Sequence, residues 1–226
     1  FVLRVCGFGF GVFTMAWLPY LLPSYGEATT LSGILAMAGS ILVAFKNWRK
    51  IDWHKLTPIL ITFIVSSCAS IHFVSVADDH LLKRILGVML IIASLWFLAI
   101  SKHVKVKPTL PVQITMGTIS GVMGGLFAMH GPAAVLYFLP CAKDKDEYVV
   151  LTMTYLLLGN IMMLGFRIHN GFLTPAVGHA FLYGIFAVAI GTWVGSKVFH
   201  RLSTDVVKKI SYAYIAISGV LSLVMS

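Results

Sequence analysis

The chain has 226 residues, of which 58% are hydrophobic and 11% are charged, and its mean hydropathy is +0.91. A water-soluble domain of this length does not have such a composition, so the sequence predicts an all-α integral membrane protein. Although the formal net charge is +9, nucleic-acid binding is not indicated, because the Lys and Arg residues form short clusters beside apolar segments, where they set the membrane orientation.

Apolar segments close to the ~20 residues that cross a bilayer as a helix recur along the chain. They cover residues 1–22, 28–45, 56–77, 81–101, 111–139, 148–166, 173–196 and 206–226. All eight Asp and Glu residues lie between these segments or at their edges, so the sequence predicts no buried carboxylate that could carry a proton. Intramembrane-protease motifs and the Walker A motif are also absent, so we expect neither an enzyme nor a bound cofactor.

The first segment and the start of the second contain candidate site residues. Pro19 and Pro23 predict a break in the chain at the end of the first segment. Trp17 is a candidate for the wall of a pore, although an aromatic anchor at the membrane interface explains it equally well. Thr30, early in the second segment, offers a hydroxyl group either to a solute or to a helix cap.

The segment at 111–139 is uncharged and is interrupted by Gly124-Gly125 and by His130-Gly131-Pro132. In hydrocarbon, such an interruption is tolerated only where the backbone packs in protein or lines a water-filled cavity. Two half-helices that end within the membrane would direct backbone amides at a solute, so the break is a candidate binding site for a small anion. Close packing between helices is the alternative explanation for these glycines.

His130 is the ionisable residue at the predicted membrane depth of this break, and such residues are functional candidates in membrane proteins. Because imidazole titrates near neutral pH, His130 is a candidate for coupling anion movement to a proton. The alternative is a neutral imidazole that bonds to a neighbouring carbonyl group.

The segment at 148–166 carries Thr152 and Asn160, and Arg167 follows at its end. Thr152 offers a hydroxyl group, for which helix capping or packing is the competing explanation. Asn160 follows a glycine and is a candidate for binding solute oxygens. Arg167 is predicted to be a solvated surface charge at the outer end of this segment, and attraction of anions toward the entrance is its alternative role.

Weak internal similarity at a separation near 120 residues predicts two homologous halves, 1–107 and 108–226, within one transport domain. Ser40 in the first half matches Asn160 in the second, which would bring both near a shared axis. If the first segment of each half enters the membrane and returns, one side collects 13 Lys and Arg residues and the other collects 4. The positive-inside rule favours this arrangement of inverted repeats, each with a broken or re-entrant first segment.

Several stretches, in this order and spacing, resemble the TauE/SafE family of sulfite exporters and related anion permeases. The first half departs from the family pattern, because Thr14, Met15 and Trp17 stand where glycines are expected. The stretches that carry the resemblance are GEATTLSG (26–33), KIDW (50–53), LLKRILGVMLIIASLWFL (81–98), SGVMGGLFAMHGPAAVLYFL (120–139) and GTWVGSKVFHRLSTDVVKKISYAYIAISGVL (191–221).

The resemblance implies a multi-pass secondary transporter of the cytoplasmic (inner) membrane. Its expected substrates are sulfite, sulfonates such as sulfoacetate, or related organic acids, moved by alternating access with a proton as the candidate coupling ion. Association into a homo-oligomer is left open. The alternatives are an intramembrane thiol–disulfide electron carrier, a passive channel or a metal permease. Cys6, Cys68 and Cys141 lack the spacing that an electron carrier or a metal site needs, so no metal ligand is expected.

Overall fold

The structure, a computed structural model, describes residues 10–46, 51–99 and 109–199, together with Ile217, Gly219, Val220 and Leu223. No β-strand occurs among these residues, so the predicted all-α fold is confirmed. Most of the segment predicted at 206–226 lies outside the described residues. The helices are α2 (Phe10–Met15), α3 (Leu18–Leu21), α4 (Tyr25–Lys46), α5 (Trp53–Val76), α6 (Asp79–Ala99), α7 (Leu110–Phe127), α8 (Gly131–Cys141), α9 (Lys145–His169) and α10 (Pro175–Phe199).

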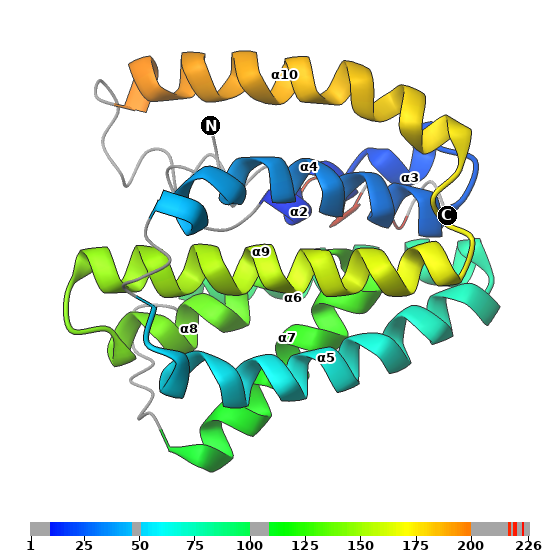
Figure 1. Ribbon diagram of the computed structural model, residues 1–226. Coiled ribbons are helices and arrows are strands. Elements are labelled where there is room, and N and C mark those ends of the chain that lie inside the picture. The colour runs from blue at the N-terminus through cyan, green and yellow to red at the C-terminus, as the bar shows by residue number, and fades with distance from the viewer. Residues whose placement is uncertain are drawn as a thin grey trace.

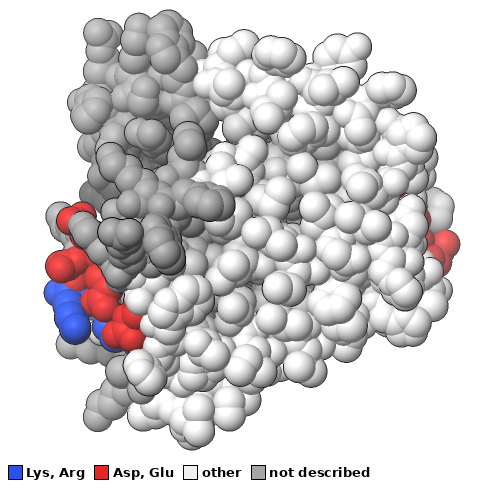
Figure 2. Space-filling view, viewed as in Figure 1, with Lys and Arg blue, Asp and Glu red and all other residues white. Residues whose placement is uncertain are grey.

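The helices follow the predicted segments closely. α4, α5, α6, α9 and α10 each cover one segment, whereas the first segment is divided into α2 and α3 and the segment at 111–139 into α7 and α8. Among the described residues, three helices are long and apolar enough to cross a membrane: Trp53–Val76, Leu110–Phe127 and Asp146–His169. For the part of the chain that the structure describes, Figure 2 shows charged side chains only at two opposite ends of the viewed face, as expected for a surface that lies in lipid.

α4 and α9 form the centre of the helix arrangement (Figure 1). They pack against each other, α10 packs against α4, and α5 packs against α9. The two divided segments lie on this centre, because α2 and α3 pack on α4 while α8 packs on α9. Each interrupted segment therefore contacts one of the two central helices.

The most extensive helix contact joins α5 to α7, and it depends on small residues. α7 presents a glycine every fourth residue to α5, at Gly117, Gly121 and Gly125. A Cβ atom built on any of these glycines would lie within 2.5 Å of an α5 side-chain atom. Helices in lipid associate through such close approach of small residues, because no hydrophobic force drives them together. The α5 side chains at these three positions are Thr62, Ser66 and Ser70.

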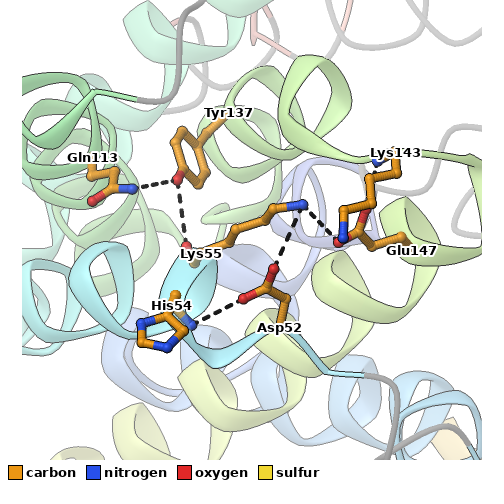
Figure 3. Close-up of polar contacts among 7 residues, drawn as sticks. All are labelled: Asp52, His54, Lys55, Gln113, Tyr137, Lys143 and Glu147. Carbon is orange, nitrogen blue, oxygen red and sulfur yellow. Dashed lines mark hydrogen bonds and ion pairs between the residues drawn. The ribbon is translucent and has the colours of Figure 1, made fainter.

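Polar contacts hold the two ends of the α7–α8 segment together (Figure 3). Gln113, in the first turn of α7, donates from Nε2 to the Tyr137 hydroxyl near the end of α8, at 2.7 Å. The segment therefore returns to the end of the molecule at which it began. At the same end, Lys55 Nζ lies 2.6 Å from Glu147 Oε1 and joins the start of α5 to the start of α9.

We expect Glu147→Gln to lower the free energy of unfolding by about 1 kcal/mol, because partly exposed ion pairs contribute roughly 0–1 kcal/mol. The Lys55 and Glu147 side chains are 21% and 13% exposed. Thermal unfolding of the purified protein in detergent would measure this loss. Asp146→Asn is the matched control, because Asp146 is exposed in the same helical turn. Equal effects of the two substitutions would mean that the Lys55 pair contributes nothing specific.

Candidate functional site

The break between α7 and α8 lies at Ala128-Met129-His130. α7 ends with Ala128 in the left-handed conformation (φ 55°, ψ 31°), the only described non-glycine residue with a positive φ. Ala128 N donates to Gly124 O at 2.9 Å, which is the hydrogen bond of an αL cap, and Met129 N donates to Met123 O at 3.2 Å. A left-handed alanine costs roughly 1–2 kcal/mol, so the surrounding contacts must hold this turn in place.

A chain of hydrogen bonds fixes the backbone on the α8 side of the break. Ser120 Oγ donates to His130 O at 2.7 Å, and the Tyr155 hydroxyl donates to Ser120 Oγ at 2.8 Å. The rings of Phe63 and Tyr155 flank the imidazole of His130, with centroid separations of 5.4 and 6.2 Å. Helices α5, α7 and α9 thus all contribute to holding the break.

His130 immediately precedes α8 and is 3% exposed. Neither of its ring nitrogens makes a well-formed hydrogen bond to a described residue, although the Leu156 backbone carbonyl lies near the ring. The first amides of α8 also lack intrahelical partners, as at every helix start, and they form the positive end of the helix dipole. Pro132, in this first turn, loses no hydrogen bond by having no N–H group. The start of α8 therefore offers donors to an anion.

A small cavity of about 30 Å³ adjoins the break. A water molecule occupies roughly 30 Å³ in the liquid, so this conformation has room for about one water at the site. Most of the lining consists of residues that lie 120 positions apart in the chain. These pairs are Phe10 and His130, Gly11 and Gly131, Val12 and Pro132, and Ala36 and Leu156; Ala128, Met129 and Asn160 complete the lining.

The two divided segments meet at the wall of this cavity. A Cβ atom built on Gly11 of α2 would lie only 2.0 Å from the carbonyl oxygen of Ala128. Only glycine allows the backbone of α2 to approach the break so closely. In the first segment, Thr14, Met15 and Trp17 stand where the family pattern has glycines. Gly11 nevertheless provides a glycine at the contact with the break. Residues 1–9, with the two preceding glycines, lie outside the described part of the chain.

The two glycines before the break have different surroundings. Gly124 faces the site, because a Cβ atom there would lie 2.9 Å from His130 Cβ. Gly125 faces α5, where a Cβ atom would lie 2.5 Å from Ser70 Cβ. Close packing against α5 thus explains why residue 125 is a glycine, and proximity to His130 explains why residue 124 is a glycine.

The other predicted site residues lie at different distances from the cavity. Asn160 is 4% exposed and lines it. Ser40 does not line it, and its hydroxyl donates to the carbonyl groups of Ala36 and Met37 at 3.3 and 3.1 Å. The Thr30 hydroxyl donates to Gly26 O within α4 at 2.7 Å.

Three further candidates lie outside the cavity lining. Thr152 is 1% exposed, and its hydroxyl has no partner among the described residues. Trp17 is 51% exposed, and Pro19 is buried in the first turn of α3. The cavity wall in the first segment is therefore formed by α2, which precedes the predicted proline break.

Two predictions about charged residues are wrong. Arg167 is not a solvated surface charge: it is 2% exposed, because its side chain extends between α4 and α7. Glu27, predicted to be outside the buried region, is 8% exposed. α4 begins at Tyr25, earlier than expected, and therefore includes Glu27 in its first turn, where the helix dipole favours a carboxylate.

Sequence reasoning did not identify Tyr155 or Phe10 as residues of the site region, and it placed Arg167 at an external entrance rather than beside the break. Tyr155 and Arg167 act through contacts between helices that are distant in sequence, so no local pattern marks them. Phe10 could have been found, because the 120-residue separation relates it to His130.

Comparison with known proteins gives one match. The family model described as "Sulfite exporter TauE/SafE" matches residues 1–222, which is almost the whole chain. No curated protein and no solved structure matches the chain.

Proposed function

Because this chain belongs to the sulfite exporter TauE/SafE family, a family of membrane anion exporters, we propose that it is a secondary transporter of sulfite, short sulfonates or related organic acids. The proposal includes alternating access in the cytoplasmic membrane, with a proton as the coupling ion. The observation that carries it is the cavity at the α7–α8 break, where the start of α8 and the unpartnered His130 ring offer hydrogen-bond donors in a buried place.

The chemistry of this cavity suits a small oxyanion. Backbone N–H groups at the start of α8 can bind oxygens without a formal charge, as helix starts do in other anion sites. Asn160 adds a carboxamide, and His130 adds an imidazole. Binding by such neutral or titratable donors is weak enough to be reversible, which transport requires. Apolar Phe10, Val12 and Leu156 complete the enclosure.

Pairs of lining residues 120 positions apart support an arrangement of two halves, 1–107 and 108–226, around this cavity. The helix contacts agree with such an arrangement: α2 and α3 pack on α4 as α8 packs on α9, and α10 packs on α4 as α5 packs on α9. A pseudo-two-fold axis between α4 and α9 would relate these contacts. The two halves would then contribute chemically different walls to the cavity, because Phe10 in the first half occupies the position that corresponds to His130 in the second half.

Alternating access requires this narrow cavity to open toward each side of the membrane in turn. At about 30 Å³ the cavity is too small for sulfite, so a substrate must enter a wider conformation. The Lys55–Glu147 contact ties α5 to α9 at the end that we propose faces the cytoplasm. Opening toward that side would separate these two helix starts.

The test is uptake of radiolabelled sulfite and of a short organosulfonate into proteoliposomes, with and without an imposed pH gradient. We expect saturable flux that responds to the gradient, and we expect His130→Ala to abolish that response and to lower the flux about tenfold. Removing one positioned hydrogen-bond donor from a buried polar site commonly costs 1–3 kcal/mol, which corresponds to such a factor.

His179→Ala is the matched control, because His179 is exposed on α10 and should not affect flux. Gradient-driven flux that persists unchanged in His130→Ala would remove His130 from the coupling mechanism. Absence of saturable flux for both anions in the unsubstituted protein would contradict the proposed function itself.

A further inference from the structure

We propose that Arg167 and Tyr25 form a second anion-binding subsite, between the cavity at the α7–α8 break and the end of the molecule where α4 begins. The subsite would take the same oxyanion as the cavity, a sulfite or a short organosulfonate. This inference rests on the proposed function and extends it, because it adds a binding position along the path of the anion.

Arg167 brings a buried positive charge close to the break. The side chain starts near the end of α9 and is 2% exposed. Its Nη1 donates to Thr29 O of α4 at 3.0 Å, and its Nη2 donates to Gly124 O of α7 at 3.0 Å. Gly124 O is at the last turn of α7, where the helix dipole is negative. The guanidinium group is therefore held by backbone carbonyls of helices from both halves of the chain.

No carboxylate among the described residues lies within salt-bridge distance of Arg167. Arginine stays protonated in proteins, so its charge is compensated only by carbonyl dipoles. A buried charge without a counter-ion costs several kcal/mol. Ionisable residues inside membrane spans are accordingly rare and usually functional. An anion that passes through the protein would supply the missing counter-charge.

Two buried hydrogen-bond donors in this region lack acceptors. Arg167 Nε and the Tyr25 hydroxyl are both buried, and neither has a partner among the described residues. Tyr25 is the first residue of α4 and is fully buried, and its hydroxyl interacts electrostatically with Arg167. Two donors and a positive charge match the oxygens of a sulfite or sulfonate group, to which arginine commonly donates two parallel hydrogen bonds.

The subsite is continuous with the cavity. A Cβ atom built on Gly33 would lie 3.0 Å from Arg167 Nη1 and 3.5 Å from Asn160 Oδ1. Asn160 lines the cavity, so the guanidinium and the cavity share this neighbour. Gly33 thus leaves space for the arginine side chain beside the cavity wall. At the break, the anion would be bound by the α8 amides and His130. After it moves toward the start of α4, it would be bound by Arg167 and Tyr25.

The deciding experiment measures equilibrium binding of radiolabelled sulfite to the purified full chain in detergent, together with thermal unfolding. We expect Tyr25→Phe to weaken sulfite binding five- to tenfold without lowering the unfolding temperature of the sulfite-free protein. The hydroxyl has no partner in the protein, so its removal breaks no intramolecular hydrogen bond. We expect Arg167→Lys to weaken binding at least tenfold, because lysine keeps the charge and loses the paired donors.

Tyr183→Phe and Arg84→Lys are the matched controls, because both side chains are exposed; both should bind sulfite as the unsubstituted protein does. Wild-type affinity in Tyr25→Phe would overturn the subsite and leave the proposed function standing. Failure of the unsubstituted protein to bind sulfite or methanesulfonate would overturn both. If Arg167→Lys does not fold, the result for Tyr25→Phe alone decides.

Discussion

Gly121→Ala is expected to destabilise the protein by roughly 2–3 kcal/mol, the upper part of the roughly 1–3 kcal/mol range typical of overpacked cores. The added Cβ atom would lie 1.9 Å from Ser66 Oγ and 2.5 Å from the backbone oxygen of Phe63. The Ser66 hydroxyl can rotate, but the Phe63 carbonyl belongs to the helix backbone and cannot yield without moving α5. The most extensive helix contact in the structure would have to widen. Thermal unfolding in detergent, followed by the fluorescence of the tryptophans, would measure the loss.

Gly165→Ala is the control for this experiment. It makes the same chemical change in a long helix, at a position where nothing lies within 4 Å of the new Cβ atom. There the substitution should be neutral or stabilising by up to about 1 kcal/mol, because alanine favours the helix over glycine. Similar unfolding temperatures for the two variants would show that α5 and α7 do not pack as closely as described.

Gly11→Ala is expected to reduce anion flux at least tenfold, with a smaller effect on stability than Gly121→Ala. The new Cβ atom would lie 2.0 Å from Ala128 O and 3.0 Å from Ala128 C, both backbone atoms of the break. Because the cap hydrogen bonds of Ala128 and Met129 hold the end of α7, the short helix α2 must move away. That movement would open the wall of the cavity between the two divided segments. Uptake into proteoliposomes would measure the effect.

Gly178→Ala serves as the control for flux, because no atom lies within 4 Å of its added Cβ. A normal rate in Gly11→Ala would mean that α2 and the break are not in contact in the working transporter. Loss of flux together with a large loss of stability would instead assign Gly11 a purely structural role.

The sequence located the break only approximately. Gly124-Gly125 do not interrupt the helix but lie in the last turns of α7, and Gly131-Pro132 begin α8, so the break itself is Ala128-Met129-His130. The geometry of the break did not follow from the sequence. The left-handed residue is Ala128, whereas local preferences would assign that conformation to a glycine. Only the contacts of the folded protein, among them those of Ser120 and Gly11, account for an alanine at this point.

The sequence could place a residue such as Asn160 by its position along one helix, but it could not place a side chain that crosses between helices. Asn160 lines the cavity because its place on α9 faces α4. Arg167 was predicted to be exposed because it lies at the end of an apolar segment. The length of its side chain and the space left by Gly33 on another helix decide its burial, and neither can be seen in the sequence around Arg167.

The packing of α5 against α7 also constrains how the chain is made. α5 ends at Val76 and α7 begins at Leu110, so the ribosome synthesises the whole of α6 before the partner of α5 exists. Until then, the face of α5 that carries Thr62, Ser66 and Ser70 has no glycine surface to contact. At about 5–20 residues per second, residues 76 to 127 take several seconds to synthesise. During that interval the nascent chain depends on lipid or on the insertion machinery to cover this face.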